Sequence, residues 1–187
     1  MKKKLFIPLT ITACVIASLT FFSSCKKDDK TPAPMPTLYD SLGGTKMVAD
    51  PANTSMMIEQ GRLGIRSVID STIFVIAADN RINGHFSVLL AEVTSGNLSG
   101  FSALSKNLTD FVAVATGAKN YSYGGKDMVA AHDPAQNSRM NEKADNDDMD
   151  AFIEDLVVGA QKNNLPNNLI QSVGRLVESL RSKVVQK

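Results

Sequence analysis

The side chains best suited to chemistry in this sequence are its two histidines, His85 and His132. His132 ends the run YSYGGKDMVAAH, in which a short helical segment follows a pair of glycines. A neutral imidazole binds metal ions and exchanges protons near neutral pH, so His132 is a candidate ligand. A lone histidine is nevertheless weak evidence for a metal site. These residues alone leave two interpretations, a buried histidine bonded to a carbonyl or the centre of the protein's function.

The two cysteines, Cys14 and Cys25, lie in an N-terminal region that predicts secretion. Three lysines, an apolar run over residues 5–22 and small residues before Cys25 form a secretory signal. Its end resembles a bacterial lipoprotein signal, which implies that residues 1–25 are a signal peptide ending at a lipidated Cys25. Cys14 is a second candidate but would leave a very short apolar region. An uncleaved membrane anchor is the alternative, although Pro8 interrupts the run, which is shorter than the ~20 residues of a span.

Residues 26–36, KKDDKTPAPMP, mix charges with prolines and predict a flexible tether. They resemble the segment after the lipid-bearing cysteine in surface-exposed bacterial lipoproteins. We therefore expect an extracytoplasmic protein, lipid-anchored to a bacterial membrane, in particular the outer membrane. Beyond Cys25 the sequence has no cysteine, which excludes a disulfide framework and a cysteine metal site from the mature chain.

The net charge argues against nucleic acid as a partner. The formal charge of +1 becomes −2 when Lys2, Lys3 and Lys4 leave with the signal, and no basic patch is evident. The remaining residues 37–187 are enough for one domain.

Apolar residues recur at helical spacing through most of that domain, and no alternation typical of strands is evident. The helix over 103–116 stops at Gly117, a typical left-handed cap. The helix after Pro166 has a proline start signal. The sequence predicts an all-α bundle of five to seven helices, with helical segments at residues 62–78, 86–93, 103–116, 148–162 and 168–185.

Five motifs in the right order resemble the truncated haemoglobins of group 1. They are TLYDSLGG (37–44), FVIAADNRINGHF (74–86), LSKNLTDFVAVATGA (104–118), the Tyr-x-Gly, Met and His positions of residues 121–132, and MDAFIEDLV (149–157). Together they cover most of the mature chain. The resemblance implies a truncated globin-like helical sandwich around a haem pocket.

This resemblance assigns roles to individual residues. His132 would be the proximal ligand of one haem iron, and Met128, four residues earlier on the same helical face, would pack on the porphyrin. Phe86 would wedge the haem plane, while Leu104, Leu108 and Phe111 would form the distal wall. Phe86 and the three distal residues are also ordinary core positions. His85 is expected to pack at the surface or at a helix corner.

Two departures from the family pattern predict an apolar distal pocket. Thr72 and Ile73 stand where the family has a Phe-Tyr pair, and Leu108 stands where it commonly has glutamine. Ile73 is thus expected to face the haem without a hydrogen-bond donor. Retention of oxygen would weaken roughly ten- to a hundredfold, since such a bond contributes ~1.5–3 kcal/mol.

Three classes of function follow from these features. The preferred one is a lipid-anchored haem protein that reversibly binds oxygen or nitric oxide. The second is an enzyme that turns over nitric oxide or peroxide with an external reductase as electron donor, because the chain has no flavin or nicotinamide motif. The third is a haem-free globin-fold interaction module. Insertions at residues 45–61 and 92–102 lengthen two connections, with no function assigned by their sequences.

Overall fold

A computed structural model describes residues 35–187 of the chain. The predicted signal peptide, the lipidation site Cys25 and nearly all of the tether lie outside the described residues. Within them, no helix is both long enough and apolar enough to cross a membrane. The elements are α1 (Leu38–Ser41), β1 (Met47–Asp50), β2 (Asn53–Glu59), α2 (Gln60–Ala78), the 3-10 helix η1 (Asn83–Phe86), α3 (Ser87–Thr94), α4 (Ser99–Thr116), α5 (Met128–His132), α6 (Asn146–Lys162), α7 (Asn167–Glu178) and α8 (Arg181–Val184).

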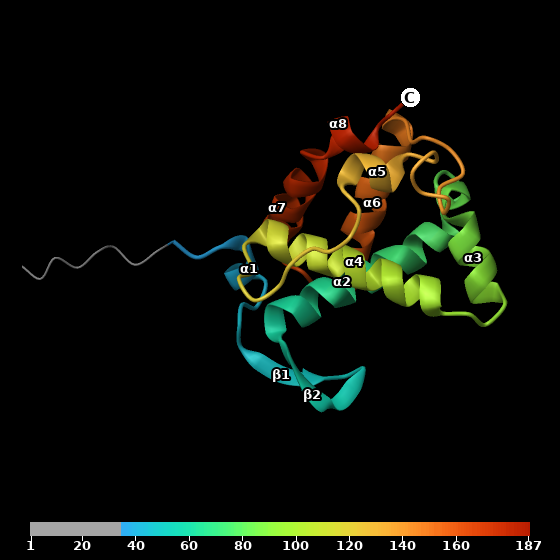
Figure 1. Cartoon of the computed structure of the whole chain (residues 1–187). Coiled ribbons are helices and arrows are strands. Elements are labelled where there is room, and N and C mark those ends of the chain that lie inside the picture. Colours follow the sequence, from blue (N-terminus) through green and yellow to red (C-terminus); the bar gives the residue numbers. More distant parts are fainter. Residues whose placement is uncertain (1–34) are drawn as a thin grey trace, which may run out of the picture. The chain divides into compact units, whose positions relative to one another are not determined.

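Helix α2 is the centre of the domain, because it packs against both α4 and α6 (Figure 1). Helix α7 packs on α6, and α3 packs on α4. Gly117 caps α4 with φ 105°, as expected, and Asp145 and Asp148 form a capping box at the start of α6. The predicted all-α, globin-like fold is confirmed, with a small hairpin added to it.

The expected single helix over residues 168–185 is instead two helices, α7 and α8. The Ser179 hydroxyl donates to the Leu176 carbonyl at 2.6 Å, and Leu180 N–H donates to the Val177 carbonyl at 2.9 Å, which tightens the last turn. The break allows Arg181 to reach Asp150 on α6 at 2.6 Å. Hydrophobic periodicity continues through the break, so the sequence pattern could not locate it.

The first insertion, residues 45–61, contains a two-stranded antiparallel hairpin that the sequence did not predict. Val48 pairs with Ile58 and Ala49 with Met57. Only the last two residues of β2 are buried, so the strand lacks the alternating apolar pattern that would have revealed it. The buried Glu59 holds its base, accepting hydrogen bonds from the Tyr39 hydroxyl and the Asn120 amide, both at 2.6 Å.

Asp50 at the far end of β1 is fixed to α2 by Arg66, whose two terminal nitrogens lie 3.0 and 2.6 Å from its carboxylate oxygens. These hydrogen bonds, helped by the Ala52 N–H, lower the pKa of Asp50 from 3.8 to about 2. A carboxyl group with a lowered folded-state pKa stabilises the fold above its unfolded pKa and loses that contribution as the pH falls.

Asp50→Asn is therefore expected to be less stable than the parent at neutral pH, with the difference shrinking as the pH falls from about 4 to about 2. Urea unfolding at a series of pH values measures it. In an Arg66→Met background the Asp50→Asn effect is expected to disappear, because the partner is gone. An unchanged pH dependence in Asp50→Asn would contradict the assigned ion pair.

Candidate functional site

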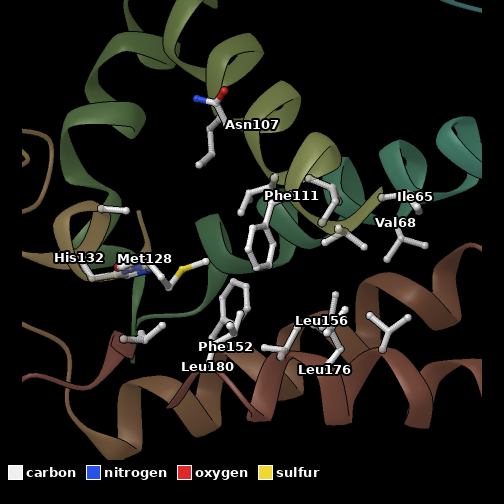
Figure 2. A pocket seen from close by; sticks show the side chains of 18 of the residues that line it. Ile65, Val68, Asn107, Phe111, Met128, His132, Phe152, Leu156, Leu176 and Leu180 are labelled. Carbon is white, nitrogen blue, oxygen red and sulfur yellow. The ribbon is translucent and has the colours of Figure 1, made fainter. Parts of the chain in front are cut away.

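A cavity of about 600 Å³ lies between α2, α4, α5, α6 and α7. Its volume suits a small organic ligand or a cofactor. Most of its walls are apolar. Figure 2 shows His132 and Met128 of α5 on one side, Asn107 of α4 across the open space from them, and Phe111 and Phe152 between this region and the part lined by Ile65, Val68, Leu156 and Leu176.

His132 lines this cavity, and its geometry fixes its tautomer. Nδ1 lies 2.8 Å from the Met128 carbonyl oxygen. A carbonyl oxygen only accepts hydrogen bonds, so Nδ1 carries the proton and donates it, which leaves a lone pair on Nε2. Burial lowers the pKa of His132 below 6.5, outweighing the opposite effect of this hydrogen bond. Among the described residues, no hydrogen bond or ion pair occupies Nε2. His132 is therefore a neutral imidazole with a free donor atom beside an apolar cavity.

Helix α5 begins at an effective cap. The Asp127 carboxylate accepts hydrogen bonds from the N–H groups of Val129 at 3.0 Å and Ala130 at 3.1 Å. Met128, the first residue of the helix, lines the cavity together with His132. The structure thus brings together the two residues that the YSYGGKDMVAAH motif predicted as partners.

Besides Met128, five residues were predicted to contact the cofactor. Four of them line the cavity, and the fifth does not. Phe86, Leu104, Leu108 and Phe111 line it. The structure does not place Ile73 among the lining residues, although it packs in one buried cluster with Leu89 and Val112, which do line the cavity. Helix α2 contributes the earlier Ile65, Val68 and Ile69 instead. Ile73 lies one turn beyond Ile69 on α2.

Asn107 and Phe152 are cavity residues that the sequence did not single out. Asn107 directly precedes Leu108 on α4 and ends the polar run of residues 105–107, which gave no signal for a pocket. Phe152 belongs to the predicted apolar face of α6, but periodicity shows only that a residue is buried and not whether it meets protein or ligand. Two polar side chains of α2 and α4 line the cavity, those of Ser67 and Asn107. The Ser67 hydroxyl donates its hydrogen bond to the Leu63 carbonyl at 3.0 Å.

His85 is buried, with 7% of its surface exposed, so the expected surface position is wrong and the helix-corner position in η1 is the observed one. Its Nε2 lies 3.2 Å from an Asp148 carboxylate oxygen. His85 also belongs to the cavity lining.

The second insertion, residues 92–102, reaches the edge of the cavity through an ion pair. Glu92 binds Arg139 through two contacts of 2.9 and 2.6 Å, and Arg139 and Lys126 are cationic members of the lining. The pair lies against Gly100, where any added Cβ would collide with both side chains. The insertion therefore contributes to the wall at this end.

Comparison with known proteins supports the fold but gives no closer identity. No protein-family model matches the sequence, and no curated protein matches it. Among solved structures, the truncated hemoglobin of Tetrahymena pyriformis in its Fe(III) form is similar, with a TM-score of 0.57 and 20% identity over 81% of this chain and 100% of that one. The 2/2 hemoglobin of Synechococcus sp. PCC 7002, in a cyanomet state with covalently attached heme, has a TM-score of 0.52 and 22% identity over 79% and 95% of the two chains. The chain therefore has the truncated haemoglobin fold.

Proposed function

We propose that this chain is a haem-binding protein of the globin type and that His132 coordinates the haem iron. The observation that carries the proposal is the neutral His132, whose Nε2 has no hydrogen-bond partner among residues 35–187 and whose side chain lines a large apolar cavity. A neutral imidazole is the protonation state that binds iron, and apolar walls exclude water from a porphyrin. The fit rests on these residues, and the similar solved structures are haemoglobins by name.

The cavity residues would contact opposite faces of the haem. Met128 and His132 would lie against one face of the haem, while Leu104, Leu108 and Phe111 would cover the other. Haem would supply an open iron position for oxygen or nitric oxide. The side chains of α2 and α4 would exclude water from that position and offer few polar groups. We propose reversible binding of a diatomic gas as the function.

Titration of the purified chain with haem tests the proposal directly. We expect a Soret band that saturates at one haem per chain, and spectral changes when the reduced, loaded protein meets oxygen or carbon monoxide. A band that grows without saturation would mean that haem does not occupy a defined site, and the proposal would then be wrong.

The apolar wall leads to a prediction for ligand release. Leu108→Gln would place an amide donor at the cavity, and we expect oxygen dissociation to slow by roughly ten- to a hundredfold, because a hydrogen bond to a charged or strongly polar acceptor contributes ~1.5–3 kcal/mol. Stopped-flow displacement of oxygen by carbon monoxide measures the rate. Val114→Gln is the matched control, since Val114 lies on the same helix but is 40% exposed and outside the lining. An unchanged rate in Leu108→Gln would show that Leu108 does not face the gas.

A further inference from the structure

Helix α5 is too short to satisfy its own backbone. It has five residues, Met128–His132, so its last four carbonyls, from Val129 onward, have no intrahelical partner. Such carbonyls need partners from elsewhere when water does not reach them. None of the residues of α5 is buried, and two of these carbonyls accept hydrogen bonds from side-chain amides.

Two amide side chains bind carbonyls of α5 from separate parts of the chain. Gln186 Nε2 donates to the Val129 carbonyl at 2.9 Å. Asn137 Nδ2 donates to the Ala131 carbonyl at 2.7 Å. The two bonded carbonyls, of Val129 and Ala131, are two residues apart and therefore lie on opposite sides of the helical turn. Together the two hydrogen bonds oppose rotation of α5 about its axis and its translation along that axis.

Both amides belong to segments that are themselves fixed. The Gln186 N–H donates to the Ala144 carbonyl at 2.9 Å, and Ala144 forms a parallel bridge with Val185. Ala144 is buried immediately before α6. Helix α8, just before Gln186, packs on α5 (Figure 1). Asn137 lies in the loop after α5, where its N–H donates to the carbonyl of Asp133, the C-cap residue of α5, at 2.8 Å. The same loop is tied to α3 by the ion pair of Arg139 with Glu92.

We propose that Gln186 and Asn137 form an amide clamp that fixes α5 and thereby orients the His132 imidazole toward the cavity. The inference rests on the proposed function, because orientation matters only if His132 binds iron. Gln186 is a positioning residue, since it binds α5 and does not line the cavity. Asn137 binds α5 in the same way but also lines the cavity, so Gln186→Met is the variant that tests positioning alone. The ring orientation depends on the Met128 carbonyl, which moves with the helix.

Isosteric variants test the clamp in the whole chain. Gln186→Met and Asn137→Leu keep the side-chain size and remove the donor, while Gln171→Met is the matched control, because Gln171 is an exposed residue of α7. In the haem-free chain, we expect hydrogen exchange of the α5 amides to be about two- to tenfold faster in each clamp variant, from the loss of one hydrogen bond. In the reduced, haem-loaded chain, we expect the iron–histidine stretching band in the resonance Raman spectrum to shift in both clamp variants and not in the control.

The two measurements separate the possible failures. Exchange at the control rate in both clamp variants would show that the amides do not hold α5 and would overturn the inference. Faster exchange with an unshifted iron–histidine band would show that the helix is held but His132 is not oriented by it, which also overturns the positioning role. A parent chain without an iron–histidine band would overturn the proposed function, while the exchange data would still decide whether the clamp holds α5.

Discussion

His132→Ala is expected to abolish histidine coordination of haem and to leave a spectrum without the iron–histidine signature. The side chain supplies the Nε2 lone pair, and alanine has no atom that replaces it. The cavity remains, so haem is expected to bind more weakly through apolar contact alone. Added imidazole should enter the vacated space and restore a histidine-like spectrum. Absorption and resonance Raman spectra of the ferrous protein measure both effects.

His85→Gln is the matched control for this experiment, because His85 is the other histidine of the chain and also lines the cavity. We expect it to keep the histidine-ligated spectrum. Loss of that spectrum in His85→Gln with retention in His132→Ala would transfer the ligand role to His85. Retention of that spectrum in both variants would show that His132 is not required for it and would contradict the assignment of His132 as the ligand.

Gly159→Ala is expected to destabilise the fold strongly, because Gly159 is where α6 meets α2. A Cβ at this position would lie 2.9 Å from the Thr72 backbone nitrogen and 3.0 Å from its Cα, and would collide with its hydroxyl oxygen. Backbone atoms of a packed helix cannot move aside independently, so the helices must separate. Overpacking of this kind costs about 1–3 kcal/mol and sometimes more.

Gly174→Ala provides the opposite expectation in the same type of element. Gly174 lies in α7, and a Cβ there would have no atom within 4 Å. Alanine favours a helix over glycine by about 1 kcal/mol, so this variant should be neutral or more stable. Denaturant unfolding followed by circular dichroism compares the two. Equal destabilisation of both would show that glycine flexibility, rather than the close approach of α2 and α6, is what the fold requires.

The sequence predicted those features that depend on local pattern. Helical periodicity located α2, α4 and α6, and Gly117 marked the end of α4. The resemblance to truncated haemoglobins, supported by the spacing of Met128 and His132, predicted that both would face one pocket, and both line the cavity. These successes share a cause: the signal lies within one turn or one face of a single element, where neighbouring residues determine the structure.

The errors arose where distant segments decide the structure. The hairpin has little apolar alternation because it is held by polar contacts of Asp50 and Glu59 with other elements. Alignment along α2 predicted Ile73 as a lining residue, whereas the lining residues of α2 are the earlier Gly64, Ile65, Ser67, Val68 and Ile69. His85 is buried because Asp148, far along the chain, offers a carboxylate. Family motifs assign roles to residues in order along the chain, but contacts between distant segments determine how deeply each side chain is buried.

The hydrogen bond from His132 to the Met128 carbonyl affects how many protons are released when a metal binds. Ligands that must first lose a proton make metal affinity depend on pH and release acid on binding. Since burial already lowers the pKa of His132 and Nδ1 keeps its proton, the metal would displace none at neutral pH. Uptake of haem at this residue would proceed without proton release, and acidification would weaken it only once the medium becomes acidic enough to protonate a buried imidazole.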